Sequence, residues 1–211
     1  DDKGFYHCFG CGKNGDIFNY VMEMENISFL EALKMLAELA GIEYTSTNFK
    51  PDPKTTNLFN LLKRVSDSYI QNLNSPIGQN AREYLNKREI NSSTIQNFLI
   101  GYSGNLQSNK FLVSCLIKEG FSLEDIINVG LAKKNQNNDL VFYFNQRIMF
   151  PILNNSGKVI AFGGRILGSG NPKYLNSPET LLFQKGKQLF GNFSAKKLLN
   201  KKKFIVCEGY M

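Results

Sequence analysis

A pair of cysteines near the start of the chain has the spacing of a metal site. Cys8 and Cys11 are separated by two residues, and Gly10 and Gly12 let the backbone turn so that its amides can face sulfur. The spacing is that of half a zinc knuckle, whereas a structural zinc needs about four ligands. His7 is adjacent to Cys8 and poorly placed to share its metal. We therefore expect a truncated zinc site whose missing pair lies upstream; the alternative is a pair of ordinary thiols.

A carboxylate closes the apolar run at the other end of the chain. Phe204–Cys207 predicts a fully buried strand that ends in Glu208, with Gly209 next to it. A carboxylate at the C-terminal end of a strand can bind Mg²⁺ or accept a proton from an attacking hydroxyl, and polynucleotide synthesis requires both roles. A solvated strand end without chemistry is the alternative interpretation.

Cationic and aromatic residues gather between these two ends. The glycines of Gly163-Gly164-Arg165 permit a bulge or a close approach of another backbone, and the polar loop Asn171–Thr180 presents lysine, tyrosine and asparagine together. Tyr174 offers a stacking face for an unpaired base. Taken singly, such residues are more often ordinary surface residues. The cations that can contact phosphates are Arg147, Arg165, Lys173 and Lys185.

Composition bounds the class of protein. The 211 residues include 25 Lys+Arg and 18 Asp+Glu, a formal charge of +7, and 42% are hydrophobic, which excludes a wholly disordered chain. No window approaches the roughly 18 apolar residues of a membrane span, and the acidic start lacks the features of a signal peptide, so we expect a cytoplasmic protein. The positive excess favours a polyanionic partner, although it is also a common solubility device. Cys115 and Cys207 are expected to be core thiols.

In the first part of the chain, the sequence predicts helices that position the cysteine pair. We expect one helix near Ile17 and a second with Ser28 as N-cap, Glu31 completing a capping box and Gly41 as the stop. Its buried stripe is expected at Leu30, Leu33, Leu36 and Ala40. The proline-containing stretch 45–56 has no apolar period and predicts a linker.

Helical spacing resumes at Asn57, with an apolar face at Leu58, Leu61, Leu62, Val65, Tyr69 and Leu73. Shorter helices are expected at Ala81–Lys87, Ser93–Ile100 and Leu123–Val129. After Asp139 the period becomes that of strands, and the turn 154–157 predicts a hairpin. The fold class is therefore α+β. The expected strands are Leu140–Phe144, Arg147–Leu153, Val159–Leu167 and Phe204–Glu208.

Five segments, in their order along the sequence, closely resemble the motifs of bacterial replicative DNA primase, and the resemblance spans nearly the whole chain. They are Phe5–Gly12, Arg147–Ile152, Gly163–Arg165, Pro172–Thr180 and Glu208–Met211. The resemblance implies a fragment truncated at both ends: the C-terminal part of a zinc-binding domain over 1–44, the linker over 45–56, the mixed α/β N-terminal subdomain of an RNA polymerase core over 57–203, and the start of a Toprim subdomain over 204–211.

The same resemblance implies an activity, its site and its cofactors. The family is a DNA-directed RNA polymerase that makes RNA primers, with one structural Zn²⁺ and catalytic Mg²⁺ or Mn²⁺. Glu208 matches the Toprim glutamate of nucleotidyl transfer, but the downstream acidic residues are missing, so the fragment alone is expected to be inactive. Cys8 and Cys11 match the second half of the zinc site. The nucleic-acid groove is implied at Arg147, Arg165, Lys173 and Tyr174, with Asn176, Lys185 and Arg88 as further members.

Implied partners are a single-stranded DNA template, the RNA–DNA hybrid, ribonucleoside triphosphates and a replicative helicase that binds through a region absent from this chain. The protein is expected to act as a monomer at the replication fork in the nucleoid, away from membranes. Two alternatives stay open: a noncatalytic module that binds single-stranded DNA, and the primase portion of a phage or plasmid primase-helicase.

Overall fold

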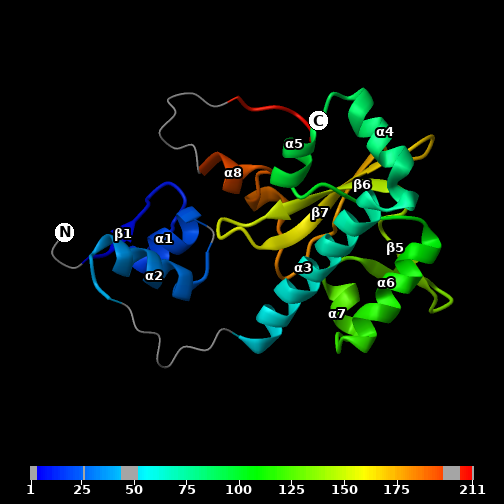
Figure 1. Cartoon of the computed structure of the whole chain (residues 1–211). Coiled ribbons are helices and arrows are strands. Elements are labelled where there is room, and N and C mark those ends of the chain that lie inside the picture. Colours follow the sequence, from blue (N-terminus) through cyan, green and yellow to red (C-terminus); the bar gives the residue numbers. More distant parts are fainter. Residues whose placement is uncertain (1–3, 26, 44–51, 197–204, 211) are drawn as a thin grey trace.

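The computed structural model describes residues 4–25, 27–43, 52–196 and 205–210 (Figure 1). At the N-terminal end, a small unit is formed by two strands and two helices. The Cys8–Cys11 turn joins its antiparallel strands, and the helices pack together after them. Figure 1 shows this blue unit to one side of the larger body. Its elements are β1 (Tyr6–His7), β2 (Asn14–Gly15), α1 (Ile17–Glu25) and α2 (Phe29–Leu39).

The ends of α2 are as the sequence predicts. Ser28 is the N-cap, Glu31 completes the capping box, and Gly41 has a φ of 65°. The buried stripe differs from the expected one: Ala32 and Ala37 are buried. The three expected leucines are half-buried and Ala40 is exposed. A two-helix unit has too little volume to enclose long side chains, so its small residues make the closest contacts.

Glu31 also joins the N-terminal unit to the larger body. Its carboxylate accepts hydrogen bonds from Ser156 Oγ at 2.7 Å and from Lys158 Nζ at 3.2 Å. Burial acts to raise the pKa of Glu31, but the hydrogen bonds from Ser28 and Ser156 outweigh it, and the net pKa is lowered. The carboxylate therefore stabilises the folded state above its unfolded pKa, and this contribution is lost as the pH falls through the folded pKa.

We expect Glu31→Ala to remove the capping box and the contact with Ser156 and Lys158 together. The loss should destabilise the N-terminal unit by about 1 kcal/mol, the usual cost of losing a helix cap. Amide hydrogen exchange in α2 measures it, with faster exchange expected in the variant. Glu38→Ala, an exposed change in the same helix, is the matched control; equal exchange in both variants would contradict the assignment.

The larger body is built on one long helix, α3 (Pro53–Asn74). It begins four residues earlier than the sequence predicts, because Asp52 caps it by accepting bonds from the amides of Lys54 and Thr55, and proline is tolerated in the first turn of a helix. The expected linker 45–56 thus ends at Asp52, and its residues 45–51 lie outside the described ranges. All six residues of the predicted apolar face are buried.

Four further helices follow α3 before the main strands. Three agree with the expected ranges within three residues, whereas α6 was not predicted. Its inner face carries the buried Asn109, which donates to the carbonyls of Asn105 and Phe144, and a polar residue there interrupts the apolar period. The helices are α4 (Gln79–Lys87), α5 (Ser92–Asn97), α6 (Leu106–Lys118) and α7 (Leu123–Asn128).

An antiparallel four-stranded sheet in the order β3-β6-β7-β8 forms the centre. The hairpin between β6 and β7 confirms the turn predicted at 154–157. Helices α3, α6 and α7 pack on the face that carries Met149 and Phe162, and α4 and α5 pack on the opposite face with Ile148 and Phe150 (Figure 1). The strands are β3 (Gly101–Tyr102), β6 (Arg147–Leu153), β7 (Val159–Ile166) and β8 (Tyr174–Asn176).

Smaller elements complete the body. A separate hairpin pairs β4 (Ala132–Lys134) with β5 (Leu140–Phe142), and a short α8 (Asn192–Lys196) follows the sheet. Short 3₁₀ turns lie at Pro76–Gly78 and Lys185–Lys187. None of the helices in the described ranges is long and apolar enough to cross a membrane.

The prediction of a buried strand at Phe204–Glu208 is wrong for its described part. Residues 205–210 form no strand, and Ile205 and Val206 are 92% and 82% exposed. Cys207 is exposed as well, so it is not a core thiol, while Cys115 is half-buried. A buried strand needs neighbours for its backbone groups, and no strand of the described ranges pairs with this segment. Phe204 itself lies outside the described residues.

Candidate nucleic-acid interface

Strands β7 and β8 bring three of the predicted site residues onto one face of the sheet. Arg165 lies opposite Tyr174, and Gly163 lies opposite Asn176. Phe150 of β6 lies opposite Gly163 on the other side. Because directly opposed residues of antiparallel strands point to the same face, the guanidinium, the phenol and the amide share the face on which α4 and α5 pack.

Tyr210 covers the middle of this face. Its ring stacks on Phe150, with centroids 5.1 Å apart and planes 10° apart, and meets Phe190 edge-on at 4.7 Å. Its hydroxyl donates to Asn176 Oδ1. Burial raises the pKa of this phenol, against the opposing effect of the Asn176 bond, so the hydroxyl stays protonated. A Cβ on Gly163 would lie 2.5 Å from the Tyr210 ring, so the glycine makes the space.

Glu208 stands two residues before this anchored ring. Its side chain is exposed, and Gly209 between them has a φ of 100°, which a residue with a side chain rarely adopts. Two residues span at most about 7 Å. Packing of Tyr210 therefore restricts the position of the Glu208 carboxylate to the neighbourhood of the β7–β8 face.

Arg147 does not line an exposed groove. It is buried, on the opposite face of the sheet, and its guanidinium donates to the carbonyls of Gly164 at 3.1 Å and of Pro172 at 3.0 Å. Burial lowers the pKa of the guanidinium. The interpretation of Arg147 as a phosphate contact is thus corrected: the side chain fixes the loop that enters β8, because its donors are taken by backbone oxygens.

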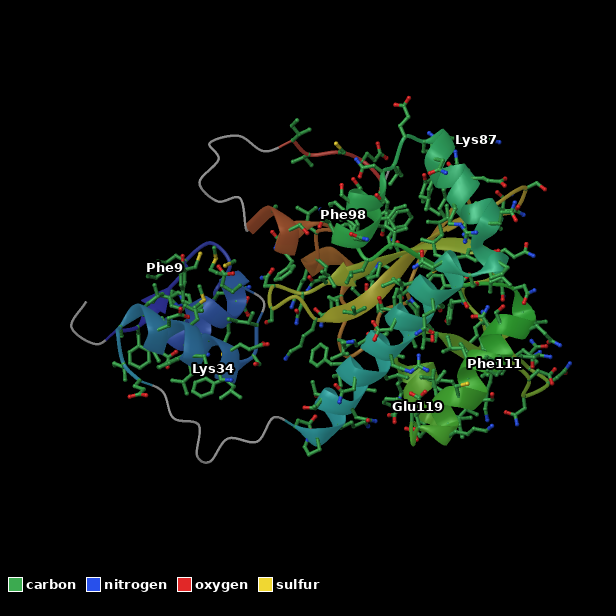
Figure 2. All side chains as sticks on the ribbon, in the orientation of Figure 1. Phe9, Lys34, Lys87, Phe98, Phe111 and Glu119 are labelled. Carbon is green, nitrogen blue, oxygen red and sulfur yellow. The ribbon has the colours of Figure 1, made fainter. Side chains whose placement is uncertain are left out.

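Arg165 and Arg88 meet at one aromatic ring of α4. The Arg165 guanidinium carbon lies 4.0 Å from the centroid of Tyr84, and that of Arg88 lies 5.5 Å from it. Arg88 also donates from Nε to the Tyr84 hydroxyl at 2.9 Å. Figure 2 shows the neighbouring Lys87 at the end of α4. The structure therefore brings Arg88 next to Arg165.

Lys173 and Lys185 have different surroundings. Lys173 is exposed immediately before β8, and its carbonyl accepts from the amide of Ile166 at 3.1 Å. Lys185 lies in a later turn, where its own amide donates to Glu179 Oε1 at 2.9 Å. A hollow of about 900 Å³ near Glu179 is lined by none of Arg165, Lys173 and Tyr174. This hollow is therefore separate from those three residues.

The thiols of Cys8 and Cys11 are exposed and interact with each other. Phe9, which lies between them in the sequence, is labelled in Figure 2 and is exposed as well. Hydrogen bonds from Cys11 and from the Gly10 amide lower the pKa of Cys8, which favours the thiolate that zinc requires. His7 turns its ring edge to Phe9 at 4.8 Å. Within the described ranges no third His, Cys, Asp or Glu joins the pair, so these residues fit half of a tetrahedral zinc site.

Sequence reasoning missed Tyr84 and the packing role of Tyr210. The four-residue spacing of Tyr84 and Arg88 places them on one face of a helix and was a usable signal. The partners of Tyr210 are 60 and 20 residues away in sequence, at Phe150 and Phe190, and nothing in the local pattern indicates them.

A sheet face whose edge presents cations, an aromatic ring and a hydrogen-bonding amide can contact phosphates and stack bases, which is the chemistry of nucleic-acid-binding surfaces. Residues 68–196 match the family described as DNA primase catalytic core, N-terminal domain, and residues 1–51 match the CHC2 zinc finger. The chain belongs to the DNA primase family.

Known relatives agree with this assignment. The DNA primase of Salmonella typhimurium is 35% identical over 227 residues, a match that covers 100% of this chain and 37% of the relative. The chain thus spans little more than a third of the length of the curated relatives it matches.

Solved structures show the same fold. The Aquifex aeolicus primase, comprising zinc-binding and RNA polymerase domains, has a TM-score of 0.62 at 32% identity, covering 94% of this chain and 47% of that one. A primase catalytic domain bound to single-stranded DNA has a TM-score of 0.58 at 35% identity, covering 68% and 46%. The mixed helix and strand architecture is that of primase catalytic cores.

Proposed function

We propose that the chain is the template-holding part of a DNA-directed RNA polymerase that makes short RNA primers for replication. The face that carries Arg165, Tyr174 and Asn176, together with the exposed Lys173 immediately before β8, supports this proposal. Its cations can contact phosphates, and its phenol can stack on a base. The sequence of the primer is determined by base pairing of the incoming nucleotides with the template. The single-stranded DNA bound by the related catalytic domain supports the same ligand class.

The chemistry that we propose is primer extension. The oxygen of a ribonucleotide 3′-hydroxyl forms a bond to the α-phosphorus of an incoming triphosphate, the bond to the bridging oxygen breaks, and pyrophosphate leaves. Glu208 is proposed to hold Mg²⁺ or Mn²⁺ with further carboxylates outside this chain. A bound divalent cation would offset the phosphate charge. Tyr210 keeps Glu208 in place, and Lys173 and Tyr174 hold the template.

The remaining partners follow from this proposal. The whole protein is proposed to act as a monomer at the replication fork, with ribonucleoside triphosphates, the RNA–DNA hybrid and a replicative helicase as partners. Cys8 and Cys11 are proposed to complete one structural zinc site with two further ligands.

Lys173→Ala tests the template-holding role. We expect weaker binding of a single-stranded DNA oligonucleotide, by about threefold to fivefold at low salt, because one phosphate contact is lost. The slope of log affinity against log salt should shrink by about 0.7, the contribution of one phosphate on a single strand. Fluorescence anisotropy over a salt series measures both quantities.

Lys134→Ala is the matched control, because it removes the same charge from an exposed position on the β4–β5 hairpin. It should leave affinity and slope unchanged. If the two variants bind alike, the β7–β8 face does not hold the template and the proposal fails.

A further inference from the structure

Two cations on different elements converge on one aromatic ring. Tyr84 projects from α4 and packs against the core cluster that contains Ile148 and Phe150. Arg165 of β7 lies over its ring at 4.0 Å, within the range of a cation–π contact. Arg88 follows α4 as its C-cap and reaches the same ring at 5.5 Å and the hydroxyl at 2.9 Å. A single partly buried side chain thus contacts both guanidinium groups.

Neither cation is neutralised where it lies. In the described part of the chain, neither Arg88 nor Arg165 pairs with a carboxylate. Arg165 donates from Nη1 to the Ile166 carbonyl at 2.6 Å, and its Nε is buried without a hydrogen-bond partner. Two like charges drawn toward one ring repel each other, so an anion near them gains from both.

We propose that Tyr84 is a positioning residue that holds Arg88 and Arg165 as a pair for successive phosphates of the template strand; this rests on the proposed function. The ring restricts the Arg165 guanidinium by its face, and the hydroxyl restricts Arg88 by accepting its Nε–H. Without the ring, both long side chains regain rotamer freedom, and that freedom has to be lost again on binding. Tyr84 acts through the arginines and touches no phosphate itself.

The test measures binding of a single-stranded DNA oligonucleotide by anisotropy over a salt series with the intact chain. We expect Tyr84→Leu to weaken binding about tenfold and to reduce the salt slope by up to about 1.4, the value for two phosphate contacts. Tyr84→Phe keeps the ring and loses only the bond to Arg88, so it should weaken binding less than Tyr84→Leu does and reduce the salt slope by up to about 0.7, the value for one phosphate contact. Thermal unfolding followed by circular dichroism confirms that each variant is folded.

Tyr143→Leu is the matched control, because Tyr143 also carries a cation, Lys133, at 5.8 Å from its ring, but on the β4–β5 side. It should bind as the unmodified chain does. A double variant, Tyr84→Leu with Arg165→Ala, should lose less than the sum of the single losses, since Tyr84 works through Arg165.

Two results separate the possible failures. If Arg165→Ala weakens binding while Tyr84→Leu does not, the positioning role is wrong and the proposed function stands. If Arg165→Ala and Lys173→Ala both leave binding unchanged, the template-holding face itself is wrong. Should Tyr84→Leu fail to fold, Tyr84→Phe decides, because equal salt slopes in Tyr84→Phe and the unmodified chain would refute the pairing of Arg88.

Discussion

Glu208→Gln should abolish primer synthesis by the full-length protein and leave template binding unchanged. The substitution keeps the size of the side chain and removes the negative charge that a divalent cation requires. We expect the rate to fall by about 10³-fold, because metal-assisted stabilisation of phosphate charge is lost. Binding is preserved because the substitution keeps the shape of this exposed side chain and changes none of the residues that are proposed to hold the template.

De novo synthesis of ribonucleotide primers on single-stranded DNA with Mg²⁺ measures the effect, alongside anisotropy for template binding. Glu124→Gln, an exposed change on α7, is the control and should synthesise normally. Normal synthesis by Glu208→Gln would refute its catalytic role. If neither the unmodified protein nor Glu208→Gln makes primers while both bind single strands equally, the protein is a noncatalytic binding module.

The second large effect is expected from Gly163→Ala. A methyl group there would meet the Tyr210 ring at 2.5 Å, and the ring is held between Phe150 and Phe190 with little room to move. Tyr210 should leave its site and release Glu208 with it. We expect about a hundredfold loss of primer synthesis, since misplacement of a catalytic group by about 1 Å has an effect of this size. Stability should fall by about 1 to 3 kcal/mol.

Primer synthesis and urea unfolding of the full-length protein measure these two effects. Gly186→Ala is the control, because no atom lies within 4 Å of a Cβ built there. Tyr210→Ala should reproduce the loss of activity without the clash. If Gly163→Ala is as active as the control, Tyr210 does not position Glu208.

The sequence was sufficient to predict those helices, caps and turns that depend on residues close together in the chain. The apolar face of α3 from Leu58 to Leu73, the capping box of Ser28 and Glu31, and the β6–β7 hairpin are confirmed, because helical period, cap chemistry and turn residues are short-range. The arrangement of the candidate site was not predicted: Tyr174 and Asn176 were expected in a polar loop, whereas they lie in β8, whose pairing with β7 puts them on one face with Arg165.

Long-range packing decided the rest. Arg147 looks like a surface cation in sequence, and only the fold shows that backbone carbonyls from distant residues surround it. Helix α6 was missed because Asn109 satisfies its amide against Phe144, a partner 35 residues away. The apolar run at 204–208 reads as a strand, but a strand forms only where another offers its hydrogen bonds.

The contacts of Arg147 have an evolutionary consequence for the loop that they support. Its guanidinium binds main-chain oxygens of Gly164 and Pro172 and not the side chains that the loop displays. The backbone path of the loop therefore does not depend on which side chains the loop displays. Substitution at Lys173 or Tyr174 can change what the surface recognises while the scaffold keeps its shape, so this loop is a place where new ligand preferences can arise at little cost in folding.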